Sequence, residues 1–242
     1  MFMKPACPLH LLIAIATLLV LPALHAQSQE AEAKFELIGE DNFEQPTKKW
    51  QMLDPKSWQF TEVDGRGVLS QYVRKGEYEP PHRSPFHVAL LKEGTVSDFD
   101  MTVSVRSTVE DYGHRDACLI FGFVDPAHFY YVHIGKKTDP HCNQIFLVNG
   151  ADRKAISLTT TEGTNWTDNW HRVKVTRRVD SGRIEVFFDN FEKPIMTAED
   201  KTLPAGRVGV GSFDDCADWD DFELRGTPAT ISETDKANAK EK

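Results

Sequence analysis

Polar side chains of the kinds that bind or transform ligands gather at the ends of three apolar runs, residues 117–124, 129–134 and 145–148. They are imidazole, guanidinium, carboxylate and amide groups: His114, Arg115, Asp116, His133, Asn143 and Gln144. Imidazole and carboxylate groups transfer protons, and a guanidinium group stabilises negative charge that develops during a reaction. If the chain is an enzyme, we therefore predict proton transfer by His133, Asp116 and His114, with Arg115 as the charge-stabilising group.

The second run is predicted to carry a ligand-binding face, because strand side chains alternate between the two faces of a sheet. Tyr130, Val132 and Ile134 form the more apolar set and should face the core. Tyr131 and His133 are then left on the opposite face. An aromatic ring beside fixed polar groups suits a sugar, because the ring stacks on the apolar sugar face while the polar groups bind the hydroxyls.

The predicted saccharide-binding residues are Arg115, Tyr131, Asn143, Gln144 and Trp166. Trp166 lies in the irregular segment 161–169, from which it would clamp a ligand at the rim. Two plainer interpretations stay open. Tyr131 could be half-buried in an ordinary sheet, and Arg115 with Asp116 could be an ion pair at a strand start, which contributes little to stability if it is exposed.

A transition-metal site is a further possibility in the same segment, since imidazole, thiolate and carboxylate groups all bind such ions. The available groups are His114, Asp116, His133, His141 and Cys142. Their spacings match no established ligand pattern, so surface or hydrogen-bonded histidines are the favoured alternative.

The elements that must position these residues are strands. Short runs rich in Val, Ile, Phe, Tyr and Thr, bounded by Gly, Pro, Asn and Asp, are typical of β structure. The predicted strands are residues 35–38, 58–61, 68–73, 87–91, 99–106, 117–124, 129–134, 145–148, 156–158, 170–179, 183–189, 194–197, 207–213 and 219–225. With no periodic helical segment after residue 26, the sequence predicts an all-β sandwich or barrel.

Four segments are expected along the 242 residues. Residues 1–26 read as a secretory signal peptide, with Lys4 in front of the apolar stretch 11–21, which is too short to span a bilayer. Residues 27–34 are a polar linker and residues 35–225 the folded domain. The tail, residues 226–242, is polar without aromatics and is expected to be disordered. The protein should therefore be secreted or periplasmic, with no membrane insertion after signal removal.

The net charge indicates which classes of partner are unfavourable, and the cysteine count limits the disulfides that the chain can form. Removing Lys4 with the signal takes the formal net charge from −9 to −10. An acidic chain gains nothing from counterion release, which argues against nucleic acid as a partner. Cys7 would leave with the signal, and three thiols cannot all pair internally. We predict a buried free thiol at Cys118 and a Cys142–Cys216 disulfide.

Seven short patterns in a fixed order carry a resemblance to a known superfamily. They are Asp41-Asn42-Phe43; Trp58 and Phe60 before Gly65 and Gly67; Asp125-Pro126 followed by Phe129-Tyr130-Tyr131; Asn169-Trp170-His171-Arg172-Val173-Lys174-Val175; the 186–189 hairpin; Gly206 with Val208-Gly209; and Trp219 with Asp221-Phe222. Over residues 35–225 the chain resembles the concanavalin A-like lectin/glucanase superfamily. Within it, the chain is similar to bacterial 3-keto-disaccharide hydrolase or family-16-like domains and, more loosely, to laminin-G modules.

This resemblance implies a jelly-roll sandwich of two curved antiparallel sheets whose concave face binds an oligo- or polysaccharide. It also implies a structural Ca²⁺ held by Asp221 with Glu40 or Asp41, a solvated acidic edge being the alternative. Two departures argue against catalysis by the known routes. Cys142 stands where the keto-disaccharide hydrolase-like domains carry an acidic residue, and the paired-carboxylate signature of family-16 glucanases is absent from the middle strands.

Three functions follow as alternatives. The first is a carbohydrate-binding jelly roll without turnover. The second is a glycoside hydrolase, or a keto-glycoside hydrolase or lyase, that acts on glycosidic bonds. The third is a laminin-G-like protein-interaction module, which would expose an apolar patch in place of a polar groove.

Overall fold

The computed structural model describes residues 35–231 together with Met1. The expected signal peptide and linker, apart from Met1, lie outside the described residues, as does most of the expected tail. Within the described part, the last strand runs to Pro228, so the fold continues past the predicted domain end at residue 225. No helix in that part is long and apolar enough to cross a membrane.

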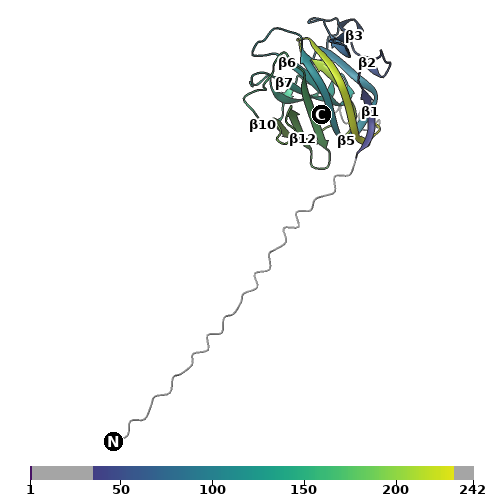
Figure 1. Cartoon of the computed structure of the whole chain (residues 1–242). Helices are drawn as coiled ribbons and strands as arrows, with labels where there is room; N and C mark the ends of the chain where they lie inside the picture. The colour runs from purple at the N-terminus through teal and green to yellow at the C-terminus, as the bar shows by residue number, and fades with distance from the viewer. Residues whose placement is uncertain (2–34, 232–242) are drawn as a thin grey trace. The chain divides into compact units, whose positions relative to one another are not determined.

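The described residues form fifteen strands and one short 3-10 helix (Figure 1). The elements are β1 (Glu36–Asp41), β2 (Trp50–Met52), η1 (Pro55–Ser57), β3 (Trp58–Val63), β4 (Arg66–Gln71), β5 (His87–Ser107), β6 (Asp116–Asp125), β7 (His128–Gly135), β8 (Gln144–Asn149), β9 (Lys154–Ala155), β10 (Ser157–Thr160), β11 (His171–Arg178), β12 (Arg183–Phe188), β13 (Met196–Glu199), β14 (Gly206–Ser212) and β15 (Ala217–Pro228). Every predicted strand overlaps one of them, and the all-β fold is confirmed.

Strand β5 joins two layers of antiparallel strands. Its first half pairs with β2 and β14, and the order continues through β6, β7, β8 and β9; we call this the β7 layer. Its second half lies between β11 and β15, and the order continues to β12, β13 and β10 on one side and to β1, β4 and β3 on the other; we call this the β15 layer. The result is a jelly-roll sandwich.

The main core contains side chains from strands of both layers. Strand β5 contributes alternate residues, as its period-two pattern predicts: Phe99, Met101, Val103 and Val105. From β7 come Tyr130, Val132 and Ile134, so the predicted orientation of this strand is confirmed. Burial of these apolar side chains is the principal force that holds the layers together.

A second core covers the opposite face of the β7 layer. Ile120 of β6, Tyr131 of β7 and Phe146 of β8 pack there with Phe213. Phe86, from the proline-containing segment 74–86 between β4 and β5, packs against this cluster. Arg153 adds its guanidinium group above the rings of Phe146 and Phe213, at 4.7 and 4.4 Å. The face that was predicted to be an open groove is therefore filled by the chain itself.

The three cysteines of the described residues are buried free thiols. The prediction for Cys118 is confirmed, and the predicted Cys142–Cys216 disulfide is wrong. Cys142 packs against Gly135 at the end of β7, where a Cβ on that glycine would lie 1.9 Å from the Cys142 sulfur. Cys216 immediately precedes β15, and its carbonyl oxygen accepts a hydrogen bond from Thr108 N at 3.0 Å. The two thiols thus occupy different packing environments.

Candidate functional site

The ends of β6, β7 and β8 meet, as the sequence pattern predicts. The antiparallel register places Cys118 opposite His133, and His133 opposite Gln144. His133 Nε2 lies 3.4 Å from Asp116 Oδ2, and both side chains are almost fully buried. Two of the three predicted proton-transfer residues are therefore adjacent.

Asp116 is fixed by the polypeptide on one side only. Its Oδ1 accepts hydrogen bonds from Phe213 N at 3.2 Å and from Ser212 Oγ at 3.4 Å. The other oxygen, Oδ2, is the one nearest to His133 Nε2 in the ion-pair geometry. The His133 ring stacks on Phe213 with centroids 5.7 Å apart and planes inclined by only 7°. Both side chains therefore have defined orientations.

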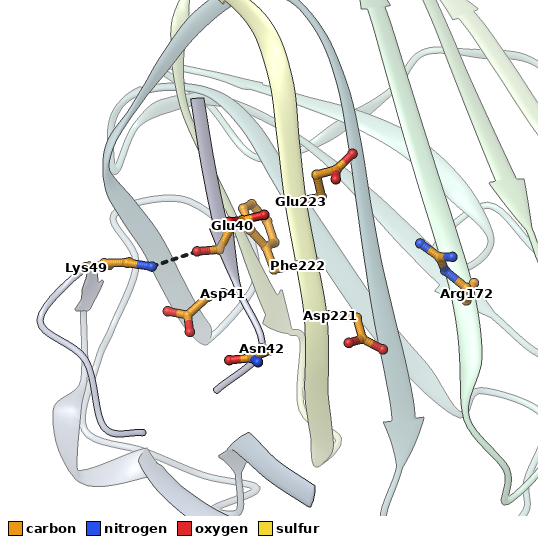
Figure 2. A pocket seen from close by; sticks show the side chains of 8 residues that line it. All are labelled: Glu40, Asp41, Asn42, Lys49, Arg172, Asp221, Phe222 and Glu223. Atoms are coloured by element: carbon orange, nitrogen blue, oxygen red, sulfur yellow. Dashed lines mark hydrogen bonds between the residues drawn. The ribbon is translucent and has the colours of Figure 1, made fainter. Parts of the chain in front are cut away.

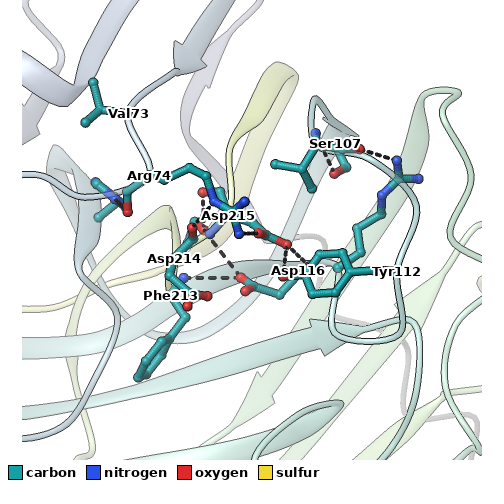
Figure 3. A network of polar contacts seen from close by, with 12 residues as sticks. Val73, Arg74, Ser107, Tyr112, Asp116, Phe213, Asp214 and Asp215 are labelled. Atoms are coloured by element: carbon teal, nitrogen blue, oxygen red, sulfur yellow. Dashed lines mark hydrogen bonds and ion pairs between the residues drawn. The ribbon is translucent and has the colours of Figure 1, made fainter.

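Two further carboxylates complete an acidic cluster of Asp116, Asp214 and Asp215, drawn in Figure 3. Asp215 Oδ2 accepts hydrogen bonds from Asp116 N at 3.1 Å and from Tyr112 Oη at 2.8 Å. Burial and the neighbouring Asp116 carboxylate raise the pKa of Asp215 to about 6. For the same two reasons, the pKa of the more exposed Asp214 is also raised. Sequence reasoning missed both residues, because only the pairing of β14 with β6 brings them to Asp116.

His114 and Arg115 do not face this cluster. His114 is mostly exposed, and its Nε2 lies 3.1 Å from Asp139 Oδ2. The Arg115 guanidinium group is buried and donates to Asp168 Oδ1 at 2.7 Å and to the carbonyl oxygen of Val109. The interpretation of Arg115 and Asp116 as an ion pair is thus wrong, because Arg115 pairs with Asp168 instead.

The other predicted saccharide-binding residues are tied into the protein. Tyr131 is fully buried, and its hydroxyl accepts from Arg153 Nη1 at 2.9 Å. Buried Asn143 has a left-handed backbone, with φ of 53°, and donates to Thr138 Oγ1 at 2.7 Å. Gln144 is half-buried and donates to the carbonyl oxygen of Asp139 at 3.1 Å.

Trp166 is not at a rim. Its side chain is 2% exposed and belongs to the main core. The indole stacks on His171 with centroids 5.7 Å apart and packs against Phe188 at 5.3 Å. The expectation of a clamping tryptophan is wrong, because the apolar area of an indole ring favours burial over exposure.

An open polar pocket of about 630 Å³ lies on the β15 layer (Figure 2). Its lining residues come from β1, the segment after it, β11 and β15: Glu40, Asp41, Asn42, Lys49, Arg172, Asp221, Phe222 and Glu223. Glu40 and Glu223 are cross-strand partners. Lys49 Nζ donates to the carbonyl oxygen of Glu40 at 2.8 Å, which fixes the chain between β1 and β2.

Asp221 is presented to this pocket by an irregularity in β15. The register of β15 against β5 shifts between Asp220 and Glu223, and Asp221 has a left-handed backbone with φ of 47°. Such bulges turn a side chain away from the regular alternation and occur often beside functional sites. The exposed carboxylate of Asp221 is held by Arg66 Nη2 at 2.9 Å and Ser104 Oγ at 3.3 Å.

The residues predicted to hold Ca²⁺ all line this pocket, but Asp41 is engaged elsewhere. One of its carboxylate oxygens accepts from Phe43 N at 3.0 Å, and the other accepts from Trp50 Nε1 at 3.0 Å. Within residues 35–231, the two groups of metal-type side chains that converge to 4.8 Å both contain Asp116 and none of the pocket residues. Calcium binding by Glu40, Asp41 and Asp221 stays a prediction.

No protein-family model matches the sequence, and no curated protein matches it. Solved structures do match. The carbohydrate-binding module CBM66 from Bacillus subtilis is 14% identical with a TM-score of 0.52, over 74% of this chain and 96% of that chain. Lectin II from Ulex europaeus is 14% identical with a TM-score of 0.53, over 79% of this chain and 99% of the lectin.

A third similar structure is the GH43 protein BlXynB from Bacillus licheniformis. It is 13% identical with a TM-score of 0.54 over 77% of this chain, which spans only 39% of BlXynB. At such identities the comparisons establish the fold alone: the chain is a jelly-roll β-sandwich whose fold is similar to that of the CBM66 module and of lectin II.

Proposed function

We propose that this chain is an exported carbohydrate-binding jelly roll whose ligand occupies the polar pocket beside β1, β11 and β15. The observation that carries the proposal is the bulge at Asp221, which directs a carboxylate with a left-handed backbone toward an open pocket of about 630 Å³. A non-glycine residue in this conformation costs free energy. Its placement at the pocket therefore points to a functional role.

The lining suits the hydroxyl groups of a saccharide. Glu40, Asp221 and Glu223 provide carboxylate acceptors, and Lys49 and Arg172 provide charged donors. Sugar hydroxyls both donate and accept hydrogen bonds, so acceptors and donors lining one pocket can select their arrangement. The pocket volume lies within the range that small-ligand sites usually have, about 300–1,000 Å³.

The fold supports the same ligand class by analogy. The similar structures named above include a carbohydrate-binding module and a lectin. Many unrelated functions share one fold, so this likeness raises the expectation of a carbohydrate ligand without identifying the sugar. The residues of the polar pocket carry the specific part of the proposal.

A glycan array followed by calorimetry on the best glycan tests the proposal. Wild-type protein should bind a saccharide, and Asp221→Asn and Arg172→Ala should each weaken binding at least about tenfold, the equivalent of one charged hydrogen bond. Asn tolerates the left-handed backbone, so Asp221→Asn removes charge without changing the fold. Glu62→Gln, an exposed acidic change outside the pocket lining, is the control. Saccharide binding that both pocket variants retain would exclude this pocket as the site.

A second candidate function is hydrolysis of a glycosidic bond by the acidic cluster, as the resemblance to 3-keto-disaccharide hydrolase-like domains suggests. The observation in its favour is the pKa of Asp215, which burial and Asp116 raise to about 6, so that this group is partly protonated near neutral pH. A carboxylic acid with such a pKa can act as a general acid. His133 and Asp116 would be the other proton-transfer groups.

Release of reducing sugar from the bound glycan separates the candidates. Release that His133→Ala abolishes while binding persists indicates hydrolysis. Binding without release indicates a lectin-like module. Binding of no glycan, together with capture of a protein ligand, favours the laminin-G-like alternative.

A further inference from the structure

His133 has an unusual environment for a buried histidine. Its side chain is almost fully enclosed, yet neither ring nitrogen has a hydrogen-bond partner among the described residues. Nε2 faces Asp116 Oδ2 at 3.4 Å without the alignment of a hydrogen bond. Buried polar groups are nearly always paired, and each exception calls for an explanation such as a bound ion.

Two other potential ligands converge on this ring. Asp116 and Cys118 are two residues apart on β6 and so share one face, and Cys118 is the cross-strand partner of His133. One ligand atom from each of the three side chains lies within 4.8 Å of the other two. Tetrahedral bonds of about 2.0–2.3 Å separate ligand atoms by roughly 3.3–3.8 Å. The 3.4 Å between His133 Nε2 and Asp116 Oδ2 lies within this range.

The surrounding residues hold these ligands in place. Phe213 N and Ser212 Oγ occupy Asp116 Oδ1, so that Oδ2 is left to bind an ion. Stacking on Phe213 fixes the plane of the His133 ring. Metal ligands are commonly oriented in this way by neighbouring hydrogen bonds and packing.

Local charge also favours a cation. Arg74 pairs with Asp215 at 3.1 Å, and Arg153 donates to the Tyr131 hydroxyl. Within residues 35–231, neither Asp116 nor Asp214 forms a salt bridge with a lysine or arginine. Asp214 is exposed, and its carboxylate lies within 4.8 Å of those of Asp116 and Asp215, so the acidic cluster reaches the protein surface.

We propose that Asp116, Cys118 and His133 bind one divalent transition-metal ion of the zinc type. Three protein ligands leave a fourth position for water or for Asp214. The thiol proton of Cys118 departs to solvent when the thiolate binds the ion. Carboxylate, thiolate and imidazole together favour Zn²⁺ or Co²⁺ over Ca²⁺ or Mg²⁺, which prefer oxygen ligands alone. The site lies on the β7 layer, so it does not depend on saccharide binding at the β15 layer.

Titration of the chelator-treated full chain with Co²⁺ tests this site, because thiolate bound to Co²⁺ absorbs in the near ultraviolet. We expect one Co²⁺ per chain, with a thiolate absorption band that Zn²⁺ displaces. Cys118→Ser should remove the band, and His133→Gln should weaken Co²⁺ binding at least about tenfold. His114→Gln, which changes an exposed imidazole, is the matched control and should bind Co²⁺ as the wild type does.

Variants of the other cysteines assign the thiolate band in a second way, which holds even if Cys118→Ser does not fold. Separate serine variants of Cys7, Cys142 and Cys216 should all retain the thiolate band, which assigns it to Cys118 by elimination. The proposal is overturned if cobalt-saturated wild type has no thiolate band, if the band survives Cys118→Ser, or if a folded His133→Gln binds Co²⁺ unchanged.

Discussion

The Asp54 carboxylate connects η1 with the loop that follows β4. It accepts hydrogen bonds from Ser57 Oγ at 2.7 Å, from Glu77 N at 2.7 Å and from Lys56 N at 3.3 Å. Burial by itself would raise the pKa of Asp54, but these hydrogen bonds outweigh it and hold the pKa below its ordinary value of 3.8. A lowered pKa in the folded state means that the charged form stabilises the fold.

Asp54→Asn should therefore lower the free energy of unfolding by about 1.5–3 kcal/mol near neutral pH, the range for hydrogen bonds to a charged group. Because the folded pKa lies below 3.8, this contribution is fully present above that pH and disappears as the pH falls through the folded pKa. Urea unfolding of both proteins over a series of pH values measures the difference. Asp180→Asn, at an exposed turn, is the control. A difference that persists unchanged in acid would contradict the argument.

Trp166 gives a second residue-scale prediction, because its place in the core is the reverse of what its loop position suggested. Trp166→Ala should cost about 3–5 kcal/mol of stability, as removal of a buried aromatic ring does. Trp166→Phe should cost less. Saccharide affinity of the folded variants should stay that of the wild type, since Trp166 does not line the polar pocket. If Trp166 were a rim residue, thermal unfolding would show little loss of stability in Trp166→Ala, and calorimetry would show weaker saccharide binding.

At the scale of elements, strand composition and alternation were sufficient to locate most strands. They did not show that β5 is one continuous strand. The sequence predicts two strands, 87–91 and 99–106, separated by residues 92–98, which begin with Lys92, Glu93 and Gly94. In the structure these residues remain in one strand of 21 residues that passes from the β7 layer to the β15 layer. Local polarity indicates a turn, but β14 pairs with β5 on both sides of these residues, at Leu90 and at Thr95, so the strand continues through a shift in register.

In the candidate sites, too, some features follow from the local sequence and others depend on contacts between residues far apart in the chain. The face assignment of Tyr131 and His133 follows from alternation alone, and it was correct. That this face is covered depends on Phe213, and the cluster at Asp116 depends on Asp215, 99 residues away in the chain. The bulge at Asp221 breaks the alternation that sequence reasoning uses. The covered face, the cluster at Asp116 and the bulge at Asp221 all depend on the pairing of strands that are distant in the sequence.

The backbone of β5 lies so close to Gly209 of β14 that a side chain at this position would collide with it. A Cβ on Gly209 would lie 2.1 Å from the carbonyl oxygen of Ala89. Gly209→Ala should therefore separate the strands and destabilise the fold by about 3 kcal/mol or more, at the upper end for overpacking. Gly65→Ala is the comparison, because Gly65 has φ of 79° and open space around it. That change should cost only about 1–2 kcal/mol, from backbone conformation. Equal losses in thermal unfolding would show that close approach is not the cause.

At the scale of the whole molecule, the thiols report on whether the sandwich opens as a unit. Cys118 belongs to the second core, Cys142 packs at the end of β7, and Cys216 immediately precedes β15. All three are buried, so an alkylating reagent can reach them only when the protein unfolds locally or globally. The burial of each thiol depends on a different part of the fold.

We expect iodoacetamide to modify none of these three thiols during a short exposure of the native protein, and all three in denaturant without reductant. Intact-mass analysis counts the adducts, and peptide mapping assigns them. A Cys142–Cys216 disulfide would leave those two residues unmodified and lower the mass by two hydrogens.

If the sandwich unfolds as one unit, the slow modification rates of the three native thiols should be equal and should rise together with urea. Faster reaction at Cys216 alone would instead mean that β15 opens independently. Because β15 pairs with β1, β4 and β5, such opening would disrupt the polar pocket while leaving the β7 layer intact.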